Sequence, residues 1–454
     1  MSDSIAAPAV APVTQSERIL SMDVLRGAAL LGIALMNILF SGLPMAANFN
    51  PKVSGGATGL NLAMFALQYV LWDGKMRGIF SLMFGAGSYL VISRAVSRGA
   101  GAEAVEVYYR RTLWLMLFGM IHAFLIWHGD ILYPYALLGL VLFPFHRPKP
   151  KSLLIVASIF VALMTGQSIY RGFDFQKTYA LAMEAEKATA AKKPLTDEQK
   201  EAEKTYEEER KYFNPSAEDL KKEAAMYSGG YFHLVAERAK TVIRWHSSPF
   251  YFSGWDMFTM MLVGIAFAKS GVLAAERSFK YYRWMLALGY GFGLPVGAVS
   301  FFLAYRVNFE PLQTVFTFST YQFARIAMTL GHVAVMLLVC KSGWFAGLRE
   351  RLAAVGQTAF SNYILHSLIY GFVFYGYGLG LFNKLQRYEL YYVVLAMWAV
   401  SLTVSPIWLR HFRFGPLEWC WRSLTYWKRQ PMRLLPEREI APALEPAAET
   451  SSAG

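Results

Sequence analysis

The stretch VLRGAALLGIALMNILFSGL, residues 24–43, carries a single charged side chain. A helix of about 20 apolar residues is long enough to cross the hydrocarbon core of a bilayer. The sequence therefore predicts an all-α polytopic membrane protein with about ten transmembrane helices. Residues 60–72 add an apolar stretch that we interpret as an extra interfacial helix. The other predicted spans lie at 76–95, 111–128, 130–146, 151–170, 251–270, 283–305, 320–340, 357–380 and 391–410.

The composition excludes an ordinary soluble protein. Hydrophobic residues make up 55% of the 454 residues and charged residues 17%, whereas a soluble domain carries about a quarter charged residues. The 12 Trp, 26 Tyr and 33 Phe suit the two membrane interfaces, where aromatic side chains gather. The net charge of +13 does not indicate nucleic-acid binding, because the excess lies on short connections between apolar stretches. Cys340 and Cys420 imply no disulfide framework.

The basic residues of the short connections predict how the chain is oriented. One side of the ten-helix arrangement collects fourteen Lys and Arg residues, and the opposite side collects six. Cytoplasmic loops carry the excess of positive charge in membrane proteins. We therefore expect both termini to lie in the cytoplasm and the lipid bilayer to surround the helices.

The chain divides into six predicted segments. They are a flexible N-terminus (1–17), helices one to five (18–170), a periplasmic helical insert (171–250), helices six to ten (251–410), a cytoplasmic tail motif (411–435) and a disordered end (436–454). In the insert, Thr196 and Gln199 have the spacing of a capping box, and Ser216 is a candidate cap for the next helix. Between Arg171 and Arg244, fourteen basic and fourteen acidic residues balance, which favours a solvated helical hairpin over a binding surface.

Polar residues at the start of the first span form the first candidate site. Asp23 and Arg26 are three residues apart, so they share a helix face and can pair. One interpretation is a cytoplasmic anchor in which Arg26 reaches the interface. The other is a basic site for an anionic, phosphate-bearing ligand at the cytoplasmic mouth. Asn37 lies three turns deeper on the same helix.

The tight turn between the third and fourth spans forms the second candidate site. His122 lies about 9 Å from His128 along a helix axis, and Asp130 follows two residues later. A buried imidazole beside a carboxylate suits proton abstraction from an acceptor hydroxyl or amine. For His128 we favour a simple polar cap at a water-facing turn. Two His and one Asp without the HExxH spacing do not predict a metal site.

The ninth span contributes a polar stripe. Gln357, Asn362 and His366 recur at helical spacing, so they either line a polar cavity or form hydrogen bonds between helices. The second arrangement is the commoner one. His332, alone in the eighth span, is interpreted as a packing residue. The sequence contains no P-loop, no GxGxxG fingerprint, no GxSxG and no CxxC.

Five motifs resemble the YeiB-like family of bacterial inner-membrane proteins. They are MDVLRGAALLGI (22–33), DGK with FSLMFG (73–85), H with WHGDIL and YALLG (122–139), VGQTAFSNY (355–363) and FGPLEWCWRSLTY (414–426). The resemblance covers residues 18–430 and implies an inner-membrane location. Its most specific part is the tail motif, with Gly415, Pro416, Glu418, Trp419 and Arg422.

The Asp-x-x-Arg-Gly start of the first span is also similar to the transmembrane acyltransferase superfamily. That resemblance implies that an acyl group passes from cytoplasmic acyl-CoA to a carbohydrate or small-molecule acceptor on the periplasmic side. His122 would be the base or acyl relay, with Asp130 orienting it. Arg26, beside Asp23, would contact the CoA phosphates. Acyl-CoA would be a co-substrate, and no cofactor would be permanently bound.

Two other functions remain open at this point. A permease or exporter would use His122 and Asp130 as a proton relay, although no inverted repeat is visible in the sequence. A membrane scaffold would use the basic tail to bind anionic lipid or a partner. The sequence does not determine the oligomeric state.

Overall fold

The computed structural model describes residues 17–247 and 254–434. The predictions for residues 1–16 and 436–454 therefore lie outside the described residues. Across the described ranges the chain folds into helices, and its β pairing amounts to one isolated bridge between Phe412 and Arg433. The predicted all-α architecture is confirmed.

The helices that build the bundle fall into two sets. Before the insert they are α1 (Leu20–Gly42), η1 (Met45–Asn48), η2 (Pro51–Val53), α2 (Gly59–Leu67), η3 (Gln68–Trp72), α3 (Lys75–Ser97), α4 (Ala102–Ile121), η4 (His122–Ile126), α5 (Leu132–Leu142), η5 (Phe143–His146) and α6 (Pro150–Ala190). After it they are α10 (Trp255–Lys269), α11 (Phe279–Arg306), α12 (Pro311–Ser342), α13 (Ala346–Gln357), α14 (Ala359–Phe374), α15 (Arg387–Leu409) and α16 (Pro416–Thr425).

Helices lie in the described part of each predicted span, but the span predicted at 357–380 combines the last residue of α13 with α14, and residues 375–380 are not helical. Among the described residues, six helical segments are long and apolar enough to cross a membrane, namely 20–42, 59–97, 150–190, 279–306, 320–342 and 387–409. Two shorter apolar helices, 132–146 and 359–374, accompany them. The chain is thus a helical protein with six candidate membrane spans. The predicted helix at 60–72 corresponds to α2 and η3, which a two-residue turn at Asp73 and Gly74 separates from α3.

Helix α10 forms the centre of the bundle although it has only 15 residues. Most of its side chains are buried, from Phe258 to Ala266. It crosses α3 at two glycines, because a Cβ on Gly85 would overlap the carbonyl of Met261 and one on Gly264 would overlap that of Leu82. The two backbones therefore touch, which is how helices pack tightly in lipid.

Helices α11 and α12 pack along each other through glycines of α11. A Cβ on Gly289 would lie 2.7 Å from the carbonyl oxygen of Ala327, and one on Gly293 would lie 2.6 Å from Met328 Cγ. Gly297 faces Val70 of η3 at 3.6 Å. Gly289 and Gly293 thus let the two helices approach closely.

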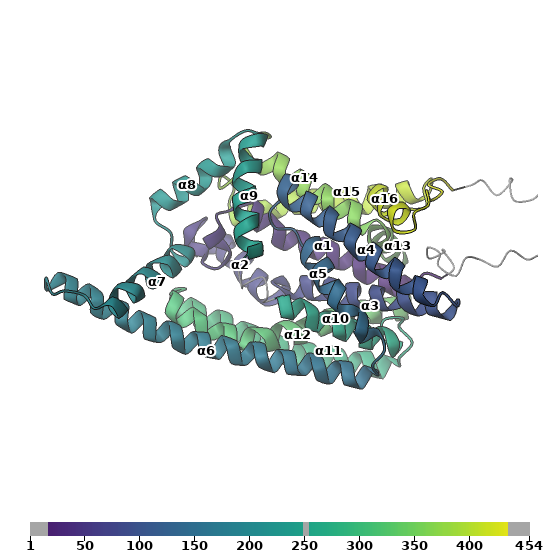
Figure 1. Cartoon of the computed structure of the whole chain (residues 1–454), viewed down its shortest axis with the longest axis horizontal. Helices are drawn as coiled ribbons and strands as arrows, with labels where there is room; N and C mark the ends of the chain where they lie inside the picture. The colour runs from purple at the N-terminus through teal and green to yellow at the C-terminus, as the bar shows by residue number, and fades with distance from the viewer. Residues whose placement is uncertain (1–16, 248–253, 435–454) are drawn as a thin grey trace, which may run out of the picture.

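The insert lies at one end of the molecule. Figure 1 shows α6 running along one edge and extending beyond the bundle towards α7 (Asp197–Phe213) and α8 (Ala217–Ser228). Both predicted N-caps are confirmed, because Thr196 and Gln199 form a capping box before α7 and Ser216 caps α8. The predicted boundary at residue 171 falls inside α6, which continues to Ala190 without a break.

The insert packs on the bundle and is more than a solvated hairpin. Its third helix, α9 (Tyr231–Ser247), lies against η4, where Arg238 Nη1 donates to the carbonyl of Leu125 at 2.6 Å. Tyr227 of α8 stacks on Phe382 with ring centroids 4.2 Å apart. The balanced charges of the insert hid these apolar contacts in the sequence.

A test of the central crossing compares two glycines. We expect Gly85→Leu to lower the thermal unfolding midpoint of the detergent-purified protein, because overpacking costs about 1–3 kcal/mol or more. Gly291→Leu on α11 is the matched control, since nothing lies within 4 Å of a Cβ at that position. Equal midpoints for the two variants would contradict the close α3–α10 contact.

Candidate functional site

A cavity of about 240 Å³ lies between α1, α3, α4, α5, α14 and α16. Figure 1 shows α13 and α16 at the end of the molecule opposite to α7 and α8, and residues of both helices line the cavity. Its inner part is apolar, with Phe80, Met83, Phe84, Leu132 and Phe360. Its outer part carries five arginines, Arg18, Arg26, Arg94, Arg111 and Arg422. Three carboxylates, Glu17, Asp23 and Glu418, also line it.

The first-span motif supplies one wall of this cavity. Arg26 Nη1 donates to Asp23 Oδ1 at 2.8 Å, as their spacing predicted, and Arg18 Nη1 donates to Asp23 Oδ2 at 2.9 Å. Arg26 also contacts the carbonyl of Gly356 at 3.4 Å. A Cβ on Gly27 would overlap the carbonyl of Leu352, so this glycine lets α1 and α13 touch.

The tail motif supplies the opposite wall. Glu418 of α16 is buried and accepts hydrogen bonds from the backbone N–H groups of Phe360 (2.6 Å) and Ser361 (3.2 Å). These are free donors in the first turn of α14, where a carboxylate is favourable. Burial raises the pKa of Glu418 above its usual range, and the hydrogen bond from the Ser361 hydroxyl acts in the opposite direction. Glu418 thus anchors the tail to the bundle.

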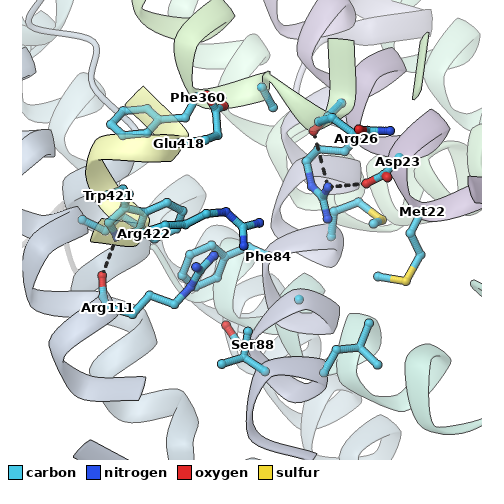
Figure 2. A pocket seen from close by; sticks show the side chains of 18 of the residues that line it. Met22, Asp23, Arg26, Phe84, Ser88, Arg111, Phe360, Glu418, Trp421 and Arg422 are labelled. Atoms are coloured by element: carbon cyan, nitrogen blue, oxygen red, sulfur yellow. Dashed lines mark hydrogen bonds and ion pairs between the residues drawn. The ribbon is translucent and has the colours of Figure 1, made fainter. Parts of the chain in front are cut away.

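The structure shows what each of the other residues of the tail motif does. Gly415 packs directly against Glu418, where a Cβ would overlap the carboxylate. Pro416 is the first residue of α16, a position that needs no N–H donor. Trp419 Nε1 donates to the carbonyl of Gln430 at 2.7 Å. Arg422 projects into the cavity beside Trp421, as Figure 2 shows.

Arg111 of α4 lines the cavity together with Arg422. The Arg111 guanidinium lies over the Trp421 ring at 3.7 Å, and Trp421 Nε1 donates to the Arg111 carbonyl at 2.9 Å. Arg422 lies over the ring of Phe414 at 4.6 Å. In Figure 2 both guanidinium groups point towards the space between Trp421 and Arg26. The sequence had treated Arg111 only as a topology signal.

His122 and Asp130 form the predicted pair. His122 Nδ1 lies 2.7 Å from Asp130 Oδ1, and both side chains are almost completely buried. The other carboxylate oxygen accepts from the backbone N–H of Tyr133 at 2.7 Å, at the start of α5. His122 begins the π-helix η4, whose end at Trp127 lets the chain turn back towards Asp130. His122 Nε2 is buried and has no hydrogen-bond partner.

Tyr363 connects this pair to the cavity. It lines the cavity, and its ring centroid lies 5.0 Å from that of His122. The Tyr363 hydroxyl accepts a hydrogen bond from the N–H of Ile131 at 3.1 Å. Along α4, His122 lies about 16 Å from Arg111, eleven residues at 1.5 Å each. The arginines and the His–Asp pair therefore occupy two ends of one region.

The polar stripe of the ninth span is divided between two roles. Gln357, the last residue of α13, lines the cavity. Asn362 Nδ2 donates to Ser405 Oγ at 2.9 Å, and His366 Nε2 lies 2.9 Å from Ser401 Oγ, so both bond to α15. This is the interhelical arrangement that the sequence left as the commoner alternative.

The remaining candidates lie elsewhere. His128 is buried and faces a small space beneath α9, which it shares with Arg238 and Thr241, so its turn does not face water. Asn37 is half-buried on α1 and does not line the cavity. His332 contacts the Tyr290 hydroxyl and the Leu71 carbonyl at 2.7 Å each, which confirms it as a packing residue.

The sequence reasoning missed a charge cluster around the buried Asp256, formed by α3, α10 and α12. Arg77 Nη2 donates to Asp256 Oδ2 at 2.6 Å, and Arg325 Nη1 lies 3.9 Å from the same oxygen. Asp256 is the acidic residue of an otherwise apolar helix, and that isolation is the signal that would have found it. Arg387, fully buried, bonds to Gln68 Oε1 at 2.9 Å.

Within the described part of the chain, no three His, Cys, Asp or Glu side chains are close enough to hold a metal ion. The structure places five arginines in the cavity lining and a buried His–Asp pair outside that lining, on the other side of Tyr363. Such an arrangement can bind an anion and accept a proton.

Comparisons with known proteins identify related chains. Residues 267–428 match the family described as "Protein of unknown function (DUF418)". The chain is 31% identical to the "Uncharacterized protein YxaH" of Bacillus subtilis (strain 168), over 93% of this chain and 97% of that protein. It is also 31% identical to the "Uncharacterized protein YeiB" of Escherichia coli (strain K12), over 90% of this chain and 96% of that protein. No solved structure matches. The chain therefore belongs to the YeiB-like family.

Proposed function

We propose that this protein is an integral-membrane acyltransferase. It moves an acyl group from cytoplasmic acyl-CoA to a carbohydrate or small-molecule acceptor on the periplasmic side. The observation that supports this most directly is the His122–Asp130 pair. Asp130 holds Nδ1, and Nε2 is buried without a partner, which is the arrangement of a general base that a carboxylate orients.

The chemical step follows from that geometry. His122 Nε2 takes the proton of the acceptor hydroxyl or amine while the acceptor oxygen or nitrogen attacks the thioester carbonyl. The carbon–sulfur bond then breaks, and the departing CoA thiolate receives the proton from the imidazolium. Asp130 stabilises the imidazolium in between, and its bond to the Tyr133 N–H keeps the carboxylate in place. The CoA sulfur leaves as a neutral thiol, and the new ester or amide carries no charge at the reacting atoms.

The cavity provides a route for the donor. Its arginines suit the phosphates of CoA, and its apolar inner part suits an acyl chain. Tyr363 separates the cavity from the His122 ring, so that a rotation of this side chain would join the two. Arg26 remains part of the donor site, although Asp23 already neutralises it in part.

The proposed orientation places both termini in the cytoplasm of a bacterium and the insert in the periplasm. Ten helices cross the inner membrane in this arrangement. Of the shorter helices, α10 is buried among longer ones, whereas α5 and α14 also expose apolar side chains such as Val141 and Phe372. The cavity then opens towards the cytoplasm, where acyl-CoA is made, and α7 to α9 face the acceptor.

The first prediction of this proposal concerns the base. We expect His122→Ala to reduce acyl transfer by about a hundredfold or more, with Asp130→Asn also strongly impaired, because the imidazole loses its orientation. The measurement is the appearance of label from radiolabelled acetyl-CoA in a product other than CoA, in membrane vesicles with periplasmic extract.

The matched control is His366→Gln, a buried histidine whose bond to Ser401 a glutamine can replace. It should retain transfer. Full transfer by the His122→Ala protein would exclude His122 as the base. Solute or proton movement that depends on His122, without any consumption of acetyl-CoA, would favour a permease.

The second prediction concerns the topology. In a background with Cys340→Ser and Cys420→Ser, we expect a membrane-impermeant maleimide to label Glu203→Cys on α7 in spheroplasts. Lys428→Cys after α16 should react only when the membrane is permeabilised. Both positions are exposed on the protein surface, so labelling depends only on the side of the membrane on which each cysteine lies. Labelling in the reverse order would overturn the proposed orientation.

A further inference from the structure

The charges that line the cavity are not evenly compensated. Asp23 is engaged by Arg18 and Arg26, at 2.9 and 2.8 Å. Glu17 pairs with Arg98, and its backbone carbonyl accepts from Arg94 at 2.6 Å. Three of the five arginines are thus held by the N-terminal segment of the protein.

The third carboxylate of the cavity is also engaged. Both oxygens of Glu418 accept hydrogen bonds from the first turn of α14, including one from Ser361 Oγ at 2.5 Å. In the described part of the chain, no carboxylate lies within 4.0 Å of the guanidinium of Arg111 or Arg422. Two arginines therefore face the cavity with no acidic partner.

The surroundings of these two arginines fix their positions. Arg111 is stacked on Trp421 and Arg422 on Phe414, so each guanidinium plane is held by an aromatic ring. Burial lowers the pKa of Arg422 to about 10, and the guanidinium of Arg18 acts in the same direction. Arg422 remains protonated at neutral pH; the nearby Glu418 carboxylate acts on its pKa in the opposite direction to burial, but no carboxylate of the described residues forms an ion pair with it.

We infer that Arg111 and Arg422 together bind the phosphate groups of an anionic ligand. Two planar, fork-shaped donors that converge on one space suit phosphate oxygens, which accept bidentate hydrogen bonds. Figure 2 shows both groups turned to the same side of Trp421. The tail helix α16 therefore contributes a ligand-binding residue, and Arg26 has the lesser role because Asp23 occupies it.

On the proposed function, on which the identity of the ligand rests, the phosphates are those of the acyl-CoA. The same chemistry is present in the headgroup of an anionic phospholipid. Both sources would place a phosphate between Arg111 and Arg422, and experiment can distinguish them.

The test measures binding of coenzyme A to the detergent-purified, full-length protein by titration calorimetry, beside pantetheine, which lacks the phosphates. We expect saturable binding of coenzyme A and none of pantetheine at the same concentrations. Arg111→Gln and Arg422→Gln should each weaken coenzyme A binding by about tenfold or more. Arg422→Lys keeps the charge but loses the fork, so its binding should fall between that of wild type and Arg422→Gln.

Arg110→Gln is the matched control on α4. Arg110 pairs with Glu106 and lies over Trp427, outside this cavity, so coenzyme A should bind this variant as it binds wild type. Thermal unfolding of each variant establishes that it is folded. A lipid source is tested in nanodiscs that contain phosphatidylglycerol, where native mass spectrometry should show fewer retained lipids in Arg111→Gln and Arg422→Gln.

Loss of either ligand in both variants supports the phosphate site and names its source. Unchanged binding of both ligands in folded Arg111→Gln and Arg422→Gln proteins would overturn it. Binding that depends on both arginines, in a protein that transfers no acyl group, leaves the site standing and removes the acyltransferase. If the protein transfers an acyl group and both variants bind coenzyme A as tightly as wild type, the acyltransferase stands and the phosphate site is removed.

Discussion

The contact between Gly27 of α1 and Gly356 of α13 is the constraint on which the cavity depends. A Cβ on either glycine would overlap a backbone carbonyl of the other helix, so only glycine lets the two helices approach so closely. The contact places Arg26 against the Gly356 carbonyl and Gln357 at the cavity wall. It also sets where α14 begins, and Glu418 binds to that beginning. The first-span motif and the VGQTAFSNY motif thus meet through Gly27 and Gly356, two residues that carry no side chain.

Much of the local structure could be predicted from the sequence. The apolar stretches, the capping boxes and the Asp23–Arg26 pair depend on residues a few positions apart, and helix periodicity is enough to relate them. The His122–Asp130 pair was within reach for the same reason, because a short turn separates the two residues. His332 could be interpreted as a packing residue because a single imidazole in an apolar helix usually finds partners on its neighbours.

The long-range arrangement could not be predicted in this way. Arg111 meets Trp421 across about three hundred positions of the chain, and no pattern in either segment indicates the other. Arg77 is similar, since it was counted as a loop charge and pairs instead with the buried Asp256. Counting basic residues assumes that each is a free loop charge, and an ion pair to a buried carboxylate breaks that assumption. The insert packs on the bundle although a solvated hairpin was predicted. Its balanced charges gave no sign of the contacts that α8 and α9 make.

The attachment of α16 through Glu418 also orders events during synthesis. Chains fold from the N-terminus as they emerge, and α16 follows α15, the last of the candidate spans. Every long helix can therefore be in the membrane before the wall that carries Arg422 exists. The cavity is the last part of the bundle to be made, so a nascent chain holds no complete anion site, and ligand binding becomes a property only of the finished protein.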